Sequence, residues 1–270
     1  MKLLVVTPTL GESPWLEETV ASVATHAPRA AHVLVAPAGV VAALAARFPT
    51  VRVVPEAGGG MYAAINAGLA AAERWEAFAY LNDDDVLLPN FSTVRQAAEA
   101  AVAAGRPLIA YGGVRLIDAR GRRLGAIPIS PAPELNRALY AQRLEPIYQH
   151  GTIVTRAVVE TIGAFDPDFR FCGDSEFLAR ACLRGIPFAC ATRRAAAAFR
   201  LRPGQATKNR AAMIAERSRV DEKLGLLATL PAAELRRARR RFRWANLALY
   251  AERIARHGFV TFDELLARGG

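Results

Sequence analysis

The sequence is poor in the features that mark disulfide-rich, membrane-spanning or secreted proteins. Its three cysteines, Cys172, Cys182 and Cys190, are odd in number and lack metal-ligand spacing, so we expect free thiols in a reducing, cytoplasmic compartment. No apolar run approaches the roughly 18 to 20 residues that a membrane span requires. The apolar N-terminus passes into Pro8 after a few residues, which indicates a first β-strand and not a signal peptide. Hydrophobic residues make up 52% of the 270, so the chain can form a full globular core.

The net charge of +10 is concentrated at one end of the chain. Residues 1–192 hold 17 Lys and Arg against 18 Asp and Glu, whereas residues 193–270 hold 18 against 7, a net of +11. This local excess favours an anionic partner, which could be phosphate groups, anionic lipid or nucleic acid.

Strands and helices alternate over the first hundred residues. The expected strands cover residues 2–7, 32–36, 51–54 and 77–81, and the helices between them begin near Ser13, Val40 and Met61. This alternation predicts a parallel, doubly wound α/β sheet. Ligands of such sheets bind at the carboxyl ends of the strands, so the segments that follow the strands should converge on one cleft.

The fourth expected strand ends in the acidic stretch Asn82, Asp83, Asp84 and Asp85. Adjacent carboxylates repel one another and resist burial, which indicates a cation at the end of this strand. Carboxylate oxygens suit Mg²⁺ or Mn²⁺, which commonly also hold substrate phosphates. The alternative is a solvated acidic turn that caps a helix starting near Asn90.

The pattern changes after Leu108. Residues 108–129 read as a hairpin with its turn at 119–122, residues 148–154 as a strand, and residues 156–162 as a short helix that ends at Gly163. Another helix opens at Gly173-Asp174, where Asp174 occupies a position typical of an N-cap.

Residues 209–268 are expected to be helical, and Pro231 opens a long basic helix within them. Six arginines between residues 236 and 243 flank Phe242 and lead to Trp244. Three interpretations remain open: a membrane-surface helix, a solvated helix packed on the rest of the protein, and, less favoured, a nucleic-acid contact. The apolar stripe would also suit a homodimer interface. Thr261 and Glu264 predict a capping box for a final helix.

Five stretches, in order, resemble one family, the inverting nucleotide-sugar glycosyltransferases of family 2 with the GT-A fold. They are VVTPTL, PEAGGGMYAAINAGLAAA, LNDDDVLLP, YGGVRLIDARGRRLG and GAFDPDFRFCGDSEFLAR, which together span about residues 3 to 190. The resemblance implies an α/β, Rossmann-like, mostly parallel central sheet flanked by helices, with a helical C-terminal extension. It implies a catalytic domain at 1–205, with a nucleotide-sugar part to about 115 and an acceptor part at 116–205, and a basic extension at 206–270.

The resemblance also implies roles for individual residues. Asp174 would be the general base, ionised at neutral pH near its reference pKa of about 3.9. Asp84, with Asp85 in support or as a second ligand, would hold Mn²⁺ or Mg²⁺, and Asp83 would contact the ribose. The full set of implied nucleotide-sugar-binding residues is Thr7, Pro8, Thr9, Gly59, Gly60, Tyr62, Asn66, Asn82, Asp83 and Asp84.

Four further residues are held in reserve. Glu176 is a second carboxylate candidate for the base, although on a helix it would point elsewhere than Asp174. His150 is expected on the acceptor side or as a buried structural residue. Arg180 would be a buried or a phosphate-facing partner. Arg202, with Arg200 and Lys208, would close over the diphosphate or lie in a solvated basic loop.

The implied activity is transfer of a sugar from a UDP or dTDP type donor to a hydroxyl of a glycan or a lipid-linked acceptor, as in bacterial cell-surface polysaccharide synthesis. The enzyme would be cytoplasmic or peripheral on the inner face of the cell membrane, and no nucleic-acid partner is expected. A nucleotidyltransferase is disfavoured because no Arg- or Lys-rich loop follows Thr9.

The sequence also departs from the family pattern. Strand two ends in HVLVAPAGV, without the usual acidic residue that contacts the base or ribose. Gly58 and Ala63 replace acidic residues, and Asn82 stands where many members have an Asp. These losses leave the nucleobase open. They also motivate an alternative in which the chain is a catalytically degenerate nucleotide-binding or scaffold protein.

Overall fold

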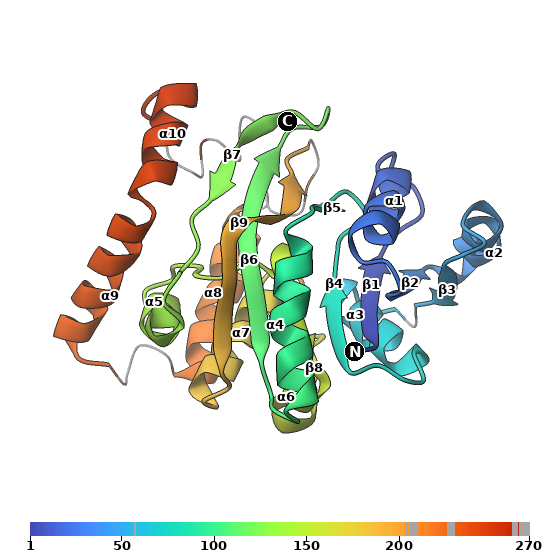
Figure 1. Ribbon diagram of the computed structural model, residues 1–270, viewed down its shortest axis with the longest axis horizontal. Coiled ribbons are helices and arrows are strands. Elements are labelled where there is room, and N and C mark those ends of the chain that lie inside the picture. The colour runs from blue at the N-terminus through green and yellow to red at the C-terminus, as the bar shows by residue number, and fades with distance from the viewer. Residues whose placement is uncertain (57, 203–204, 206–209, 226–229, 261–263, 265–270) are drawn as a thin grey trace.

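The computed structural model describes residues 1–56, 58–202, 205, 210–225, 230–260 and 264 (Figure 1). Its first part confirms the predicted alternation of strands and helices. The elements are β1 (Leu3–Pro8), α1 (Leu16–His26), β2 (Ala31–Ala36), α2 (Ala38–Arg47), β3 (Arg52–Pro55), α3 (Met61–Ala71) and β4 (Ala77–Tyr80).

The second part contains the predicted hairpin and the helix that carries Asp174. Its elements are β5 (Val86–Leu87), α4 (Phe91–Ala103), β6 (Ile109–Ile117), β7 (Arg123–Ile127), α5 (Asn136–Tyr140), β8 (Thr152–Thr155), α6 (Arg156–Ile162), α7 (Gly173–Leu183) and β9 (Phe188–Arg200). The strand expected from residue 148 begins only at Thr152, because Gln149–Gly151 form a 3₁₀ turn.

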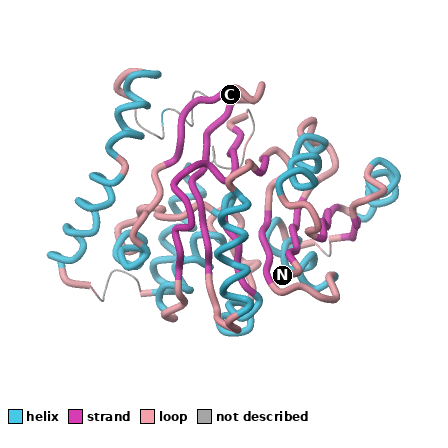
Figure 2. Tube along the Cα trace, viewed as in Figure 1, coloured by secondary structure: helices cyan, strands magenta, loops and turns pink. Residues whose placement is uncertain are grey.

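The strands form one mixed sheet in the order β3-β2-β1-β4-β8-β6-β9-β5, with β7 paired to the outer part of β6. β3, β2, β1 and β4 are parallel to one another. β8 runs antiparallel between β4 and β6, and β9 is parallel to β6. Most strands therefore point the same way, as predicted, and the helices cover both faces (Figure 2).

The C-terminal segment forms α8 (Arg210–Leu224), α9 (Ala232–Ala245) and α10 (Leu247–His257). The single long helix predicted after Pro231 is wrong, because the chain bends between α9 and α10 at the buried Asn246. The Asn246 side-chain amide donates 2.9 Å bonds to the carbonyls of Ile129 and Phe242, which fixes the bend. Thr261 of the predicted capping box lies outside the described residues.

The extension predicted at 206–270 shares its core with the rest of the molecule. Val220 of α8 belongs to the main hydrophobic cluster, and Ala238 and Phe242 of α9 pack on α5. Along the described helices we find no segment that is both long and apolar enough to cross a membrane.

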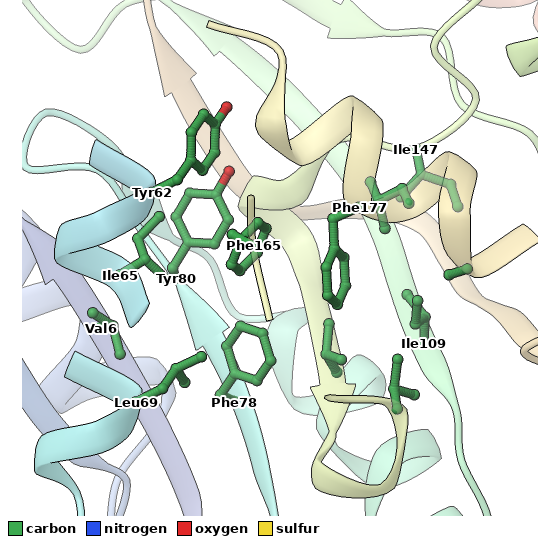
Figure 3. Packing of buried hydrophobic residues seen from close by; sticks show 14 of the residues in the cluster. Val6, Tyr62, Ile65, Leu69, Phe78, Tyr80, Ile109, Ile147, Phe165 and Phe177 are labelled. Carbon is green, nitrogen blue, oxygen red and sulfur yellow. The ribbon is translucent and has the colours of Figure 1, made fainter. Parts of the chain in front are cut away.

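An aromatic cluster joins α3 and β4 to α7 (Figure 3). Phe165 is at its centre: its ring stacks on Phe177 at 4.6 Å and on Tyr62 at 5.7 Å between centroids. The rings of Tyr80 and Phe78 meet Phe165 edge-on at 5.5 and 6.1 Å. The hydroxyls of Tyr62 and Tyr80 both point away from Phe78, so the cluster presents polar groups on one side only.

We expect Phe165→Ala to lower the free energy of unfolding by about 3–5 kcal/mol, because it removes a 5% exposed ring that touches four others. Urea unfolding followed by circular dichroism measures the change. Phe259→Ala is the matched control: Phe259 is 96% exposed, and its loss should change stability by no more than about 0.5 kcal/mol. Equal effects of the two substitutions would contradict the central position of Phe165.

Candidate active site

A cleft of about 660 Å³ opens at the carboxyl ends of β1 and β4. The end of β1 and the residue after it contribute Pro8 and Thr9, the glycine loop and α3 contribute Gly60 and Tyr62, and α7 contributes Asp174. The acidic stretch, the turn before β8, the loop before α7 and the residues after β9 also line the cleft. Their lining residues include Asn82, Asp83, Asp84, Gln149, His150, Arg170 and Arg202. The convergence of separate segments that the topology predicted therefore occurs.

Asp83 faces the cleft next to the segment that follows β1. The hydroxyl of Thr9 donates a 2.6 Å hydrogen bond to its carboxylate, and the hydroxyl of Ser13 donates to its backbone carbonyl at 2.8 Å. Burial raises the pKa of Asp83, while the bond from Thr9 opposes the rise. The hydroxyl oxygen of Ser13 also accepts the backbone N–H of Trp15 at 3.3 Å, and α1 begins at Leu16, shortly after the start expected near Ser13.

Asp84 is buried and pairs with the guanidinium of Arg202. Burial, followed by repulsion from Asp85, raises the pKa of Asp84 to about 7 even though Arg202 stabilises its anion. Arg202 itself lies over the ring of Trp15, 5.7 Å from its centroid. The Asp84 carboxylate thus already has a positively charged group, the Arg202 guanidinium, beside it.

Asp85 is fully buried and engages donors with both oxygens. Oδ1 accepts the backbone N–H of Arg200 at 2.9 Å. Oδ2 accepts the side-chain N–H of Asn82 at 3.1 Å and lies 3.1 Å from Nε2 of His150. These contacts favour the supporting role expected for Asp85 over direct metal ligation.

Arg200 does not close over the cleft, although the sequence suggested that it could. Its side chain is 1% exposed and donates to the carbonyl of Asp84 at 2.7 Å and to the carboxylate of Glu18 at 2.6 Å. It lies over Trp15, 5.5 Å from the ring centroid. Arg200 therefore fixes the acidic loop from behind. Lys208, its predicted companion, lies outside the described residues.

The residues around Asp84 fit a divalent cation. The side-chain oxygen Oδ1 of Asn82 is buried and lacks a hydrogen-bond partner among the described residues, so it is free to ligate. Within the described part of the chain no three His, Cys, Asp or Glu side chains form a complete metal cage. A hard cation held by one or two protein oxygens and by substrate phosphates needs no such cage.

Asp174 is the second residue of α7 and does not cap it, because the N-cap is Cys172 and its side chain makes no capping bond. The Asp174 carboxylate accepts hydrogen bonds from the hydroxyl of Tyr62 at 3.1 Å and from the backbone N–H of Ser175 at 2.8 Å. Burial raises its pKa above the reference value assumed from the sequence, and the bonds from Ser175 and Tyr62 oppose the rise.

A glycine lets Tyr62 approach α7 this closely. A Cβ atom at Gly173 would lie 2.6 Å from the ring of Tyr62, so any larger residue would displace that ring. The other glycine requirement is in the loop before α3, where Gly58, Gly59 and Gly60 all have positive φ angles of 81°, 101° and 89°. Of these, Gly60 lines the cleft.

The loop that leads into Asp174 depends on Glu216, which the sequence interpretation missed. The carboxylate of Glu216, on α8, accepts the backbone N–H groups of Arg170, Phe171 and Cys172 at 2.8, 2.7 and 3.0 Å. Arg170 and Phe171 line the cleft. No local motif could have identified Glu216, since more than forty residues separate it from this loop.

His150 lines the cleft and is buried, and its Nε2 lies 3.1 Å from Oδ2 of Asp85. Burial lowers its pKa, but the carboxylates of Asp85, Asp174 and Asp84 outweigh burial and leave the pKa above its ordinary value. The His150 ring also contacts Phe199, 4.6 Å away between centroids.

Glu176 and Arg180 form a buried structural unit. Glu176 is 0% exposed and pairs with Arg180 at 3.0 Å and with Lys223 at 2.8 Å, which leaves it away from the cleft. Arg180 also donates to the carbonyls of Ile162 and Ala164, so the phosphate-facing role suggested for it is wrong.

Two predicted binding residues are directed elsewhere. The hydroxyl of Thr7 is 3.0 Å from Nε2 of His32 on β2, and Thr7 is fully buried. The side-chain amide of Asn66 is bonded to both the carbonyl and the N–H of Phe165, at 2.8 and 3.2 Å. Thr7 links β1 to β2, and Asn66 holds the backbone of Phe165 in the aromatic cluster. Neither side chain lines the cleft.

Comparison with solved structures identifies the fold. The structure of S. aureus TarS 1–349 in complex with UDP-GlcNAc superposes with a TM-score of 0.61 at 17% identity, covering 98% of this chain and 78% of that one. The mannosyltransferase PcManGT from Pyrobaculum calidifontis, in complex with GDP-Man and Mn²⁺, gives 0.57 at 18% identity over 99% and 79%. This likeness confirms the predicted GT-A fold class. No family model and no curated protein sequence matches the chain.

We expect Glu216→Ala to destabilise the protein by on the order of 3 kcal/mol, because three backbone donors next to Asp174 lose their acceptor. Amide hydrogen exchange should accelerate at residues 170–172. Glu222→Ala, an exposed position on the same helix, is the matched control and should leave both stability and exchange unchanged. Unchanged exchange at 170–172 in the Glu216 variant would refute this role.

Proposed function

We propose that the protein is an inverting glycosyltransferase that moves a sugar from a nucleoside diphosphate to an acceptor hydroxyl. The observation that carries the proposal is the composition of the cleft. Asp84 and the unpartnered oxygen of Asn82 come from the end of β4, and Asp174 comes from α7, and all three residues line the same 660 Å³ space. Inverting transfer requires a site for the diphosphate and a base for the acceptor, and these residues supply both.

Asp174 would act as the general base. It would accept the acceptor hydroxyl proton as the oxygen attacks the anomeric carbon and the bond from that carbon to the diphosphate breaks. Burial raises its pKa, so its carboxylate is a stronger base than an exposed Asp would be. The bonds from Tyr62 and Ser175 hold its orientation. No covalent nucleophile is needed for a single displacement.

Mn²⁺ or Mg²⁺, when bound, would neutralise the departing diphosphate. Asp84 and Asn82 Oδ1 would hold the cation, and Asp83 would accept hydrogen bonds from the ribose hydroxyls. Arg202 pairs with Asp84 in the present structure and, being 29% exposed, can turn to the diphosphate when the cation takes its place. Gly60, next to the cleft, allows close approach of the sugar diphosphate.

The donor would be of the UDP or dTDP type, and the acceptor a glycan or lipid-linked hydroxyl met in the cytoplasm. The TarS structure contains UDP-GlcNAc and the PcManGT structure contains GDP-Man with Mn²⁺, which supports a sugar nucleotide as the ligand class. Three free cysteines support a reducing compartment. The chain lacks the acid after β2, where Ala36 and Pro37 stand, and this keeps a non-catalytic nucleotide-binding protein as the alternative.

Calorimetric titration with UDP, GDP, CDP and dTDP, each with and without Mn²⁺, tests the donor site. We expect Mn²⁺-dependent binding of one nucleotide, lost in Asp84→Ala and kept in Asp174→Asn. Transfer from the corresponding sugar nucleotide should fall at least about a hundredfold in Asp174→Asn, since general bases contribute about 10²–10⁴. Binding with no transfer in the parent protein would favour the non-catalytic alternative. No binding by the folded parent would overturn the proposal.

The pH profile of turnover provides a second prediction. Because Asp174 must be ionised and its pKa is raised, the acidic limb should lie above the pH at which an exposed Asp titrates. Tyr62→Phe removes a hydrogen bond that stabilises the carboxylate, so its pKa should rise further and the limb should move to higher pH. Tyr80→Phe removes a hydroxyl from the same cleft without a bond to Asp174 and should leave the limb in place. A limb that moves to lower pH in Tyr62→Phe would contradict this assignment.

A further inference from the structure

A second hollow lies at the bend between α9 and α10, and it shares no lining residue with the nucleotide cleft. We call it the elbow groove; its volume is about 510 Å³, and its walls include Leu144, Arg239, Arg243, Trp244, Leu247 and Arg253. α9 and α10 form the edge of the molecule opposite α2 and β3 (Figure 1). The sheet, the cleft and the aromatic cluster use none of these groove residues.

The groove combines exposed apolar side chains with arginines that have no internal counterion. Trp244 is 70% exposed and Leu247 is 54% exposed, high values for side chains of their size. Within the described ranges, neither Arg239 nor Arg243 lies within ion-pair distance of a carboxylate. Arg253 has an Nε–H that is buried without a hydrogen-bond partner among the described residues.

The charge around the groove is one-sided. The stretch 232–257 carries eight arginines and two glutamates, a net of +6. Neither glutamate lines the groove. Glu252 pairs with Arg123 and Arg256, and Glu234 lies in the first turn of α9. A surface of this kind attracts a polyanion or an anionic interface.

The bend is held rigidly, so the groove exists before any partner binds. Asn246 anchors the bend to Ile129, and Phe242 and Ala238 bury the inner face of α9 against α5. α10 is tied to β7 through Arg123 with Glu252 at 2.7 Å and through Nε2 of His257, which lies 2.6 Å from the carbonyl of Leu124. Because these contacts use the inner faces, Trp244 and Leu247 remain directed outward.

We propose that the elbow groove is a docking surface for an anionic lipid bilayer. Trp, Leu and Tyr side chains insert at the boundary between headgroups and acyl chains, and arginines bind the phosphates of anionic headgroups. A nucleic acid would match the charge but would leave the exposed Trp244 and Leu247 without an apolar environment, so the bilayer is the better fit. The surface is independent of the nucleotide cleft, and its test does not require catalysis.

Vesicle flotation tests the proposal with the full chain at about 0.1 M salt. The vesicles contain phosphatidylcholine alone or with about 30% phosphatidylglycerol. We expect binding only to the anionic vesicles. Removing three arginines, as Arg239→Gln with Arg243→Gln and Arg253→Gln, should weaken binding on the order of a hundredfold, at about fivefold per arginine. The pair Trp244→Ala with Leu247→Ala should weaken it at least about tenfold.

Matched controls separate the groove from general charge and apolarity. Arg74, Arg106 and Arg184 are exposed arginines elsewhere, and changing all three to Gln should leave vesicle binding within about fivefold of the parent. Ile214→Ala is the control for the Trp244 and Leu247 pair, because Ile214 is 53% exposed on α8, and it should likewise leave vesicle binding within about fivefold of the parent. Thermal unfolding verifies that every variant is folded.

Three outcomes would overturn the proposal. They are equal binding to neutral and anionic vesicles, equal loss in groove and control variants, and binding to a 20-base-pair duplex that exceeds vesicle binding and depends on the same arginines. The third outcome would assign the groove to nucleic acid. Nucleotide binding by calorimetry should be the same in parent and groove variants, so failure here leaves the proposed function untouched.

Discussion

Three consecutive carboxylates at the end of a buried strand set the main constraint on this structure. Each carboxylate raises the free energy of ionising its neighbours, and burial adds to that cost. Two arginines at the end of β9 compensate this cost. Arg200 is buried and donates hydrogen bonds to the Asp85 carboxylate and to the Asp84 carbonyl, and Arg202 pairs with the Asp84 carboxylate on the side of the cleft. The close packing of β9 beside β6 and β5 delivers both arginines to this point. The acidic loop and the carboxyl end of β9 are therefore a single electrostatic unit.

The opposite part of the cleft depends on packing more than on charge. Phe165 stacks between Tyr62 and Phe177, and Tyr62 in turn bonds Asp174, so the position of the carboxylate is set by the aromatic cluster. Glu216 then fixes the approach of the chain to α7. Because α8 supplies this acceptor, the C-terminal helices are part of the framework of the cleft and do more than extend it.

The sequence predicts this fold well where local pattern decides, and less well where distant contacts decide. The strand-helix alternation and the helix end at Gly163 follow from local signals, and the structure has them. Their place in motifs predicts Thr7 and Asn66 at the cleft, yet their hydrogen-bond partners, on β2 and in the loop before α7, direct both side chains inward. The bend at Asn246 cannot be read from the local pattern either, because a helical pattern continues through it and one of the carbonyls that bind its side chain belongs to the distant Ile129.

Distant contacts also decide how the positive charge of the last quarter of the chain is interpreted. Part of that excess is internal: Arg202 neutralises Asp84, Arg217 pairs with Glu145, and Lys223 bridges Asp166 and Glu176. A buried or half-buried pair of this kind says nothing about an external partner, since both charges are already compensated. Arg239 and Arg243 of α9 differ: they lie exposed beside Trp244, whereas Arg241 of the same helix pairs with Glu134. Net charge in a sequence thus indicates a partner only after its internal counterions are subtracted, and here part of the remainder lies at the bend between α9 and α10.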